Sequence, residues 1–599
     1  MNKVVIPAVL FFGSVFMLQM FGLSHPVLIF AVWIMQMLLY TKAQKNEISS
    51  RDLCIGSVFG TVFAIALYLG SKIVISQIDE GWFNISNSLY NGSWSGNYFQ
   101  SFQNEDIYKI IAVIASGCIL FSSLFTVLRK RILAVSLADT TEQHYEILKS
   151  AGLIFLCWLP YVLSYYPGLI YEDSLNSVWQ ALGYWDYNNH HPFMYTMFIK
   201  LFMKIGQVFG DLNFGCFLYS IAQMIIVSTI FGYSITWLGR HGVPKSWRTV
   251  ITLFYAIVPV FPLHAISMWK DPLFSAALLL EILLLADVAE SKGSILREKK
   301  TIFKMILVNA MICFTRNNGI YIVALVNLIL SAVYGIRIKS KLKINWFVWP
   351  IALVVILWYV ISGPIYKACG ISDDFEESIG VPLQQMAAVV VYDGNLSEEE
   401  IEFMNELMPI EKYREVYTPC CVDHLKWNEN FNTEFLENNK AEFIKKYVSL
   451  FIKNPSICLK AWMLQTHGFW AVNSWEFNFF EYGLAPEMYA ENIGIKQEDL
   501  ILNTFGVSLR GILKTTFQFL NSSVLTWIVL FVSAMLVVLK KERYLLAMLP
   551  LIGTFLTLMI GVPLADWLRY VLIYVYALPV VILLPYVVAK ERNKENAYG

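Results

Sequence analysis

Apolar residues come in long blocks along this chain, and polar residues gather between the blocks. A block of about 17 to 25 apolar residues lets a helix cross a bilayer. The sequence has about fourteen such blocks, at residues 4–23, 26–41, 53–75, 110–128, 151–166, 214–238, 250–268, 272–288, 303–314, 320–333, 346–366, 517–539, 544–564 and 571–589. The pattern predicts an all-α polytopic membrane protein with about 14 transmembrane helices, although block 303–314 is short.

Composition supports this prediction. Of the 599 residues, 57% are hydrophobic and 15% are charged, and the formal net charge is zero. In a membrane protein the position of the charges matters more than their sum. We therefore expect a lipid bilayer as the main partner and no nucleic acid.

Basic residues concentrate in alternate loops, which predicts the orientation of the chain. The clusters lie at residues 42–51, 129–131, 240–248, 292–304, 337–343, 540–543 and 590–594. Cytoplasmic loops are rich in Lys and Arg. The pattern therefore predicts a multi-pass plasma-membrane protein with both termini in the cytoplasm. It holds only if 193–208 lies flat on the outer surface, because a crossing there would put the later clusters outside.

The blocks divide the chain into four segments. Residues 1–150 form N-terminal transmembrane helices with an outward loop at 77–109, and 151–366 form a core whose first outer loop is 167–213. Residues 367–516 are an extracytoplasmic insertion, and 517–599 are C-terminal helices with a cytoplasmic tail. We expect the insertion to be mostly helical, because Ser397 and Glu400 form a capping box and 440–451 forms a second helix. The sequence leaves open whether disulfides form among Cys369, Cys420, Cys421 and Cys458 of this outward segment.

Acidic and imidazole side chains gather just beyond the fifth block. Glu172 and Asp173 follow a Pro-Gly pair, and His190 and His191 follow shortly after. Asp173 or Ser174 is predicted to cap a short amphipathic helix, and His191-Pro192 to open a second one. Each residue alone could be a helix cap, a solvated charge or a turn residue, and these alternatives stay open. Together they indicate a site, because charge at a membrane border usually serves one.

A second set of polar residues borders later blocks on the same predicted side. Its members are Lys270, Asp271, Arg316, Asn317, Arg569 and Tyr570. The three cations oppose the charge bias of the loops, and a lipid phosphate or pyrophosphate would suit guanidinium and ammonium groups. The alternative is that they anchor helices at the interface or pair with Asp271 and Asp566.

These motifs resemble the GT-C glycosyltransferases, closest to the protein O-mannosyltransferase and lipid A aminoarabinose transferase branch. The resemblance rests on an acidic residue after a span, outer amphipathic helices, a His-Pro motif, a second acidic residue and Arg-Tyr before the last span. It implies a GT-C-like fold and transfer of a hexosyl or pentosyl group from a polyprenyl-phosphate donor to an extracytoplasmic acceptor, such as an envelope polymer, glycolipid or protein. Asp173 would be the catalytic carboxylate with Glu172 beside it, and Arg569 would contact the carrier phosphate. The remaining residues, namely His190, His191, Lys270, Asp271, Arg316, Asn317 and Tyr570, become candidate substrate-binding residues.

The chain departs from that family in three ways. Phe193 follows His-Pro where a second Pro is frequent, several spans precede the motifs, and the insertion lies between spans. The acceptor therefore stays open. The Pro-Gly, Trp-Lys-Asp-Pro and Thr-Arg-Asn-Asn-Gly signatures also resemble an uncharacterised bacterial membrane family, which implies no activity.

The chemistry of such a transfer adds further expectations. Asp173 would act as the base, with a pKa raised by the membrane surface. No ligand spacing in the sequence demands a cofactor, although Glu172, Asp173 and Asp271 could hold a divalent cation, Mg or Mn. Gln384, Gln385 and Trp470 of the insertion would offer an acceptor surface. The rival hypothesis is a transporter or lipid-linked saccharide flippase, for which Glu281 is the acidic residue inside a span.

Overall fold

The computed structural model describes residues 2–74, 98–135, 145–335, 348–371, 375–474, 481–515, 520–562, 564–565 and 567–597. Within these ranges the regular structure is helical, and extended segments meet only in isolated bridges. Eight described helices are long and apolar enough to cross a membrane: Pro26–Lys45, Ser50–Ser71, Asn104–Ala134, Glu146–Ser164, Leu212–Arg240, Lys270–Glu290, Glu542–Gly561 and Leu568–Ala589. The chain is a multi-pass helical membrane protein, as its apolar blocks predict.

The other predicted blocks form shorter helices. Four correspond to the apolar helices Val4–Met20, Gly319–Tyr334, Ala352–Ala368 and Ser522–Val538. Block 303–314 lies in a helix of 17 residues. Block 250–268 is not one helix, because the chain breaks at Val258 and Pro259 before a short second helix. The count of 14 crossings stays a prediction.

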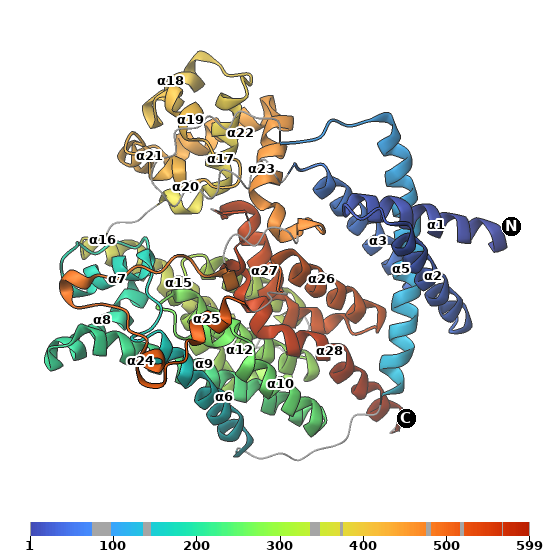
Figure 1. Cartoon of the computed structure of the whole chain (residues 1–599), viewed down its shortest axis with the longest axis horizontal. Helices are drawn as coiled ribbons and strands as arrows, with labels where there is room; N and C mark the ends of the chain where they lie inside the picture. Colours follow the sequence, from blue (N-terminus) through green and yellow to red (C-terminus); the bar gives the residue numbers. More distant parts are fainter. Residues whose placement is uncertain are drawn as a thin grey trace.

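The N-terminal helices lie together on one side of the molecule (Figure 1) and pack against the C-terminal helices through a shared hydrophobic cluster. They are α1 (Asn2–Met20), α2 (Pro26–Lys45), α3 (Ser50–Ser71) and α5 (Asn104–Ala134). Close approach of α3 and α5 needs glycine, because a Cβ on Gly60 would lie 2.4 Å from the Gly117 carbonyl carbon. Buried Asp52 pairs with Arg129 at 2.8 Å. Of the predicted outward loop 77–109, residues 77–97 lie outside the described residues.

The central helices carry the first outer loop and the middle of the bundle. They are α6 (Tyr145–Ser164), α7 (Glu172–Leu182), α8 (Phe193–Phe209), α9 (Leu212–Arg240), α10 (Lys245–Ile257), α11 (Val260–Ala265), α12 (Lys270–Glu290), η1 (Ser294–Arg297), α13 (Lys299–Thr315), α14 (Gly319–Leu330), η2 (Ser331–Gly335), α15 (Val348–Val360), η3 (Ile361–Ile365) and α16 (Tyr366–Ala368). Helix α12 is buried almost all round, since it packs against α9, α13, α27 and α28. It is therefore the central helix of the bundle.

Residues 379–461 of the insertion fold around their own hydrophobic core, and their helices lie beside the bundle in Figure 1, in yellow and orange. Residues 500–513 of the insertion pack against α6 instead. The helices of the insertion are η4 (Phe375–Ser378), α17 (Gly380–Val391), α18 (Glu398–Leu407), α19 (Ile410–Val416), α20 (Asp423–Lys426), α21 (Thr433–Asn438), α22 (Lys440–Lys453), α23 (Pro455–Trp470), η6 (Glu481–Gly483), η7 (Glu491–Ile493), α24 (Leu500–Phe505) and α25 (Leu509–Leu513). The predicted capping box of Ser397 and Glu400 is confirmed, as is the helix over 440–451. The predicted acceptor surface is wrong for Gln384 and Gln385, because both are buried and donate to backbone carbonyls.

The C-terminal helices return to the bundle. They are α26 (Ser522–Val538), η8 (Glu542–Tyr544), α27 (Leu545–Gly561), η9 (Leu568–Val571) and α28 (Leu572–Ala597). The insertion is fixed to them through α23, where Trp462 donates to the Met559 carbonyl and Gln465 to the Val562 carbonyl. All nine cysteines are free thiols, so the open question of disulfides resolves to none.

Candidate charge cluster

Two loops far apart in sequence lie side by side and set the position of the site. Leu169 donates to the Ile266 carbonyl at 3.0 Å, and Met268 donates back to the Leu169 carbonyl at 2.9 Å. Gly168 makes this approach possible, because it has a φ of +135° and a Cβ there would lie 2.2 Å from Ser220 Oγ. The pairing places the start of α7 beside the start of α12.

Helix α7 begins earlier than the sequence indicates, with Tyr171 at the N-cap position in place of Asp173 or Ser174. Its first residue is Glu172, so Asp173 lies in the first turn and does not cap the helix. Ser174 Oγ instead accepts from the Tyr171 amide and donates to the Met268 carbonyl at 2.8 Å. The predicted end at Gly183 is confirmed, with a φ of +81°. Asp173 is thus free to point away from the helix terminus toward the bundle.

The centre of the site is a chain of alternating charges drawn from four elements. Arg569 in η9 donates to Asp173 Oδ2 at 2.6 Å and to Asp271 Oδ2 at 2.7 Å. Arg316, which follows α13, lies 2.7 Å from the other oxygen of Asp271. The Asp271 side chain is 1% exposed, whereas that of Asp173 is 34% exposed. The alternative that the cations pair with Asp271 is therefore confirmed for both arginines, and Asp566 lies outside the described residues.

Aromatic rings enclose the Arg569 guanidinium. Its central carbon lies 4.3 Å from the ring centroid of Trp269 and 4.6 Å from that of Trp567. The Tyr171 ring stacks on the Trp269 indole, and their ring centroids are 4.1 Å apart. Cation–π contacts of this kind orient a guanidinium and exclude water. Tyr570 places its ring 5.4 Å from the Arg316 guanidinium.

Lys270 and His191 form the second part of the site. Lys270 Nζ lies 2.8 Å from His191 Nδ1. Because an ammonium only donates, the imidazole accepts at Nδ1 and carries its proton on Nε2. Burial lowers the pKa of His191 well below its usual range, and Lys270 lowers it further, so the ring is neutral. His191 Nε2 and Trp269 Nε1 are both buried without a hydrogen-bond partner.

The pKa of Asp173 moves against the prediction. Burial acts to raise it, but the attraction of Arg569, followed by His191 and Lys270, outweighs burial and holds the pKa well below its ordinary value of 3.8. The expectation of a raised pKa is therefore wrong for the protein alone. The reason is the guanidinium within hydrogen-bond distance, which the residues next to Asp173 in sequence do not reveal.

The insertion borders this cluster. His190 Nδ1 lies 3.7 Å from Glu377, whose carboxylate is 2.7 Å from Lys426, and Lys426 also pairs with Asp423 at 2.9 Å. Burial acts to raise the pKa of Glu377, but Lys426 and then His190 outweigh it and lower the pKa. This contribution of the insertion is not predictable from the sequence, because neither Glu377 nor the Asp423–Lys426 pair lies in a recognisable motif. The loop between α7 and α8 also contacts the bundle, because Asn317 donates to the Asn189 carbonyl at 2.8 Å.

Most of the predicted site residues lie close together in the structure. The exceptions are the position of Glu172 and the predicted metal site. Glu172 is exposed and takes part in no hydrogen bond or ion pair among the described side chains. The suggested metal ligands Glu172, Asp173 and Asp271 do not form a described group with metal-ligand spacing. Since Asp173 and Asp271 both bind Arg569, the arrangement suits a guanidinium more than a metal ion there. Trp269 belongs to the Trp-Lys-Asp-Pro signature, yet only the structure shows that it and Trp567 contact Arg569.

Comparison with known proteins gives one match. A family model described as a family of unknown function (DUF6020) matches residues 184–598. The matched range includes the candidate residues from His190 to Tyr570 and begins after Glu172 and Asp173. No curated protein and no solved structure matches the chain.

Proposed function

The chain belongs to the DUF6020 family, and because the function of that family is unknown, we propose an activity from the site itself. The protein is a membrane glycosyltransferase that moves a sugar from a polyprenyl-phosphate donor to an acceptor outside the cytoplasm. The resemblance of its motifs to GT-C enzymes suggests the donor class. The charge cluster supplies the independent support.

The observation that carries the proposal is an excess of buried donors. Among the described side chains, Arg316 and Arg569 pair with two carboxylates, those of Asp173 and Asp271, while Lys270 contacts His191. The N–H groups at His191 Nε2 and Trp269 Nε1 are buried and have no acceptor among the described residues. An unpaired buried donor costs about 1–3 kcal/mol. A phosphate brings several acceptor oxygens and negative charge, and therefore satisfies donors that the protein alone leaves unpaired.

Phosphate binding also prepares Asp173 for catalysis. A phosphate that takes the outer face of Arg569 competes with Asp173 for the same guanidinium, while Asp271 continues to hold the inner face. Asp173 then loses its strongest stabilising charge, and its pKa rises toward the range of a useful base. Because its side chain is 34% exposed, an acceptor hydroxyl can reach it.

The reaction then balances with groups already named. The acceptor oxygen attacks the anomeric carbon and forms the new glycosidic bond, while its proton passes to Asp173. The bond from the anomeric carbon to the phosphate oxygen breaks, and the leaving polyprenyl phosphate keeps the electron pair. Arg569, Arg316 and Lys270 stabilise the charge that develops on this phosphate. Attack opposite the leaving group inverts the anomeric centre.

We expect Arg316→Ala to weaken the binding of polyprenyl phosphate by about 10- to 100-fold, since a hydrogen bond to a charged group contributes about 1.5–3 kcal/mol. The measurement is a titration of purified protein in nanodiscs made of neutral lipid. Lys204→Ala is the matched control, because Lys204 is an exposed cation on the outer helix α8 and lies outside the cluster. Equal affinity of the Arg316→Ala protein and the parent for polyprenyl phosphate would contradict the proposed binding of phosphate by Arg316.

A specific observation favours a second candidate, a transporter or flippase. Glu281 lies within α12, is 1% exposed, and finds no hydrogen-bond partner among the described residues for either carboxylate oxygen. Asn309 of α13 is fully buried, and its amide atoms are likewise unpartnered. Acidic residues inside a membrane span commonly serve transport or proton movement.

The two candidates differ in what Glu281→Gln does. We expect this variant to transfer sugar at the parental rate, because Glu281 lies away from the charge cluster. A transporter would instead lose movement of the labelled lipid-linked saccharide across proteoliposomes. Both quantities can be followed in one preparation. If the parent protein moves the labelled lipid-linked saccharide across the bilayer but transfers no sugar, the second candidate replaces the glycosyltransferase proposal.

A further inference from the structure

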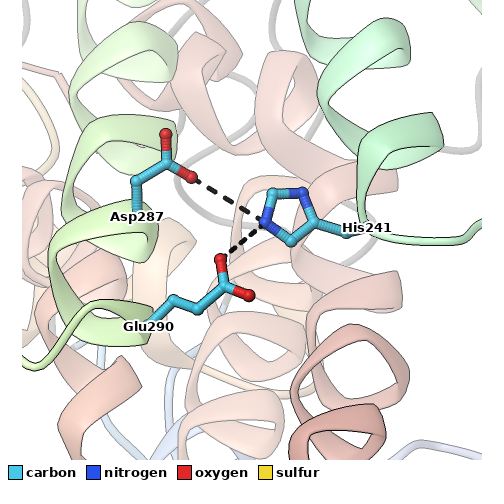
Figure 2. Close-up of side chains that lie close together, drawn as sticks. All are labelled: His241, Asp287 and Glu290. Carbon is cyan, nitrogen blue, oxygen red and sulfur yellow. Dashed lines mark hydrogen bonds and ion pairs between the residues drawn. The ribbon is translucent and has the colours of Figure 1, made fainter. Parts of the chain in front are cut away.

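Three side chains of residue types that can ligate a metal ion, those of His241, Asp287 and Glu290, lie close together (Figure 2). They are at the opposite end of α12 from the charge cluster. Asp287 and Glu290 are three residues apart near the end of α12 and share one face. His241 follows the last residue of α9. Its Nε2 lies 3.0 Å from Glu290 Oε2 and 3.8 Å from Asp287 Oδ1, and the three ligand atoms lie within 4.8 Å of one another.

Neighbouring groups hold two of these side chains in place. His241 Nδ1 lies 2.8 Å from the Trp237 carbonyl oxygen, and because a carbonyl only accepts, Nδ1 carries a proton. The indole of the same Trp237, which is 1% exposed, donates to Asp287 Oδ1 at 2.7 Å. Backbone carbonyls and buried donors fix metal-binding imidazoles and carboxylates in this way.

The fixed imidazole makes the short contact to Glu290 informative. With Nδ1 protonated, Nε2 can approach a carboxylate oxygen at 3.0 Å only when a proton or a metal ion lies between them. A proton on Nε2 satisfies Glu290 alone, while Asp287 Oδ1 lies 3.8 Å from Nε2 and accepts from Trp237. A divalent cation can contact both carboxylates and neutralise their charge.

We propose that His241, Asp287 and Glu290 bind a divalent transition-metal ion such as Mn²⁺ or Zn²⁺. One imidazole and two carboxylates suit these ions, whereas Mg²⁺ prefers oxygen ligands throughout. The side chains are 15%, 30% and 46% exposed respectively, so the ion can enter from solvent and keep water in its remaining positions. The neighbouring cation, Arg240, lies over the Tyr233 ring at 5.4 Å. The bound ion ties the α9–α10 turn to the end of α12, at the end that the loop charges predict to be cytoplasmic.

Mn²⁺ titration of the purified full-length protein, followed by electron paramagnetic resonance, tests the site. We expect one Mn²⁺ to bind with nitrogen coupling from His241, and Zn²⁺ but not Mg²⁺ to displace it. His241→Ala and Glu290→Gln should weaken binding about tenfold or more. Glu298→Gln is the matched control, because Glu298 is an exposed carboxylate near the same end of the bundle and outside the three.

Two outcomes would overturn the proposal. The first is a parent protein that binds no Mn²⁺ or Zn²⁺, which would leave His241 as the protonated partner of Glu290. The second is bound Mn²⁺ without nitrogen coupling, which would place the ion elsewhere. The coupling is measured on the parent protein, so the test stands even where a variant fails to fold. It is also independent of sugar transfer.

Discussion

Asp173→Asn is expected to lower the rate of sugar transfer from a polyprenyl-phosphate donor by about 10²- to 10⁴-fold, the usual contribution of a general base. The amide keeps the shape of the carboxylate but cannot accept the proton of the acceptor hydroxyl. Donor binding should change far less, because Arg316, Lys270 and Arg569 all remain. The measurement is single-turnover transfer in detergent with a radiolabelled sugar donor.

The control for this variant is Asp186→Asn. Asp186 is an exposed carboxylate in the same outer loop, between α7 and α8, and lies outside the cluster. Its replacement should leave the transfer rate at the parental value. A transfer rate within a few-fold of the parent for Asp173→Asn would exclude Asp173 as the base.

The pH profile of the same reaction tests how Asp173 becomes a base. Only the ionised carboxylate accepts a proton, so activity falls as the pH drops through its pKa. In the free protein the neighbouring cations, chiefly Arg569, hold that pKa below 3.8 against the opposing effect of burial, and kcat/KM follows the free protein. Once phosphate engages Arg569 the pKa rises, so the acidic limb of kcat should lie at higher pH than that of kcat/KM. Coincident limbs would show that Arg569 stays on Asp173.

The sequence predicts the helices of this protein well, because length and hydropathy alone decide which segments cross a bilayer. The turns of the first outer loop follow from local chemistry too, as Gly183 and Pro192 show. The break after Ile257 was missed, although Pro259 and Pro262 are visible inside the apolar block. Hydropathy does not register such a break, since proline leaves an apolar block apolar.

The residues of the candidate site were largely predictable from the sequence, but the contacts between them were not. Charges at the ends of several apolar blocks identify Asp173, Lys270, Asp271, Arg316 and Arg569. Arg569 reaches Asp173 across 396 residues of chain, and no local pattern encodes that contact. The direction of the Asp173 pKa shift depends on this single long-range contact. Glu377 of the insertion is likewise brought beside His190 by tertiary packing alone, which no local pattern encodes.

Asp271→Asn is expected to destabilise the protein by about 3–5 kcal/mol, the usual cost of removing one partner from a buried ion pair. Asp271 is fully buried and is the carboxylate that Arg316 and Arg569 share. Without its charge, two guanidinium groups lose their counter-ion inside the bundle. The measurement is the free energy of unfolding in mixed detergent micelles.

The matched control for Asp271→Asn is Asp173→Asn, which removes a carboxylate from the same Arg569 but at a position 34% exposed to solvent. Water can hydrate the released guanidinium there, so the loss of stability should be smaller. Inorganic phosphate should restore more stability to Asp271→Asn than to the parent, because an anion that binds the folded state shifts unfolding by mass action and here replaces the missing charge. Equal stability of Asp271→Asn and the parent would mean that Asp271 does not compensate the two arginines. Restoration by phosphate would tie the stability of the cluster to the same anion that the proposed reaction requires.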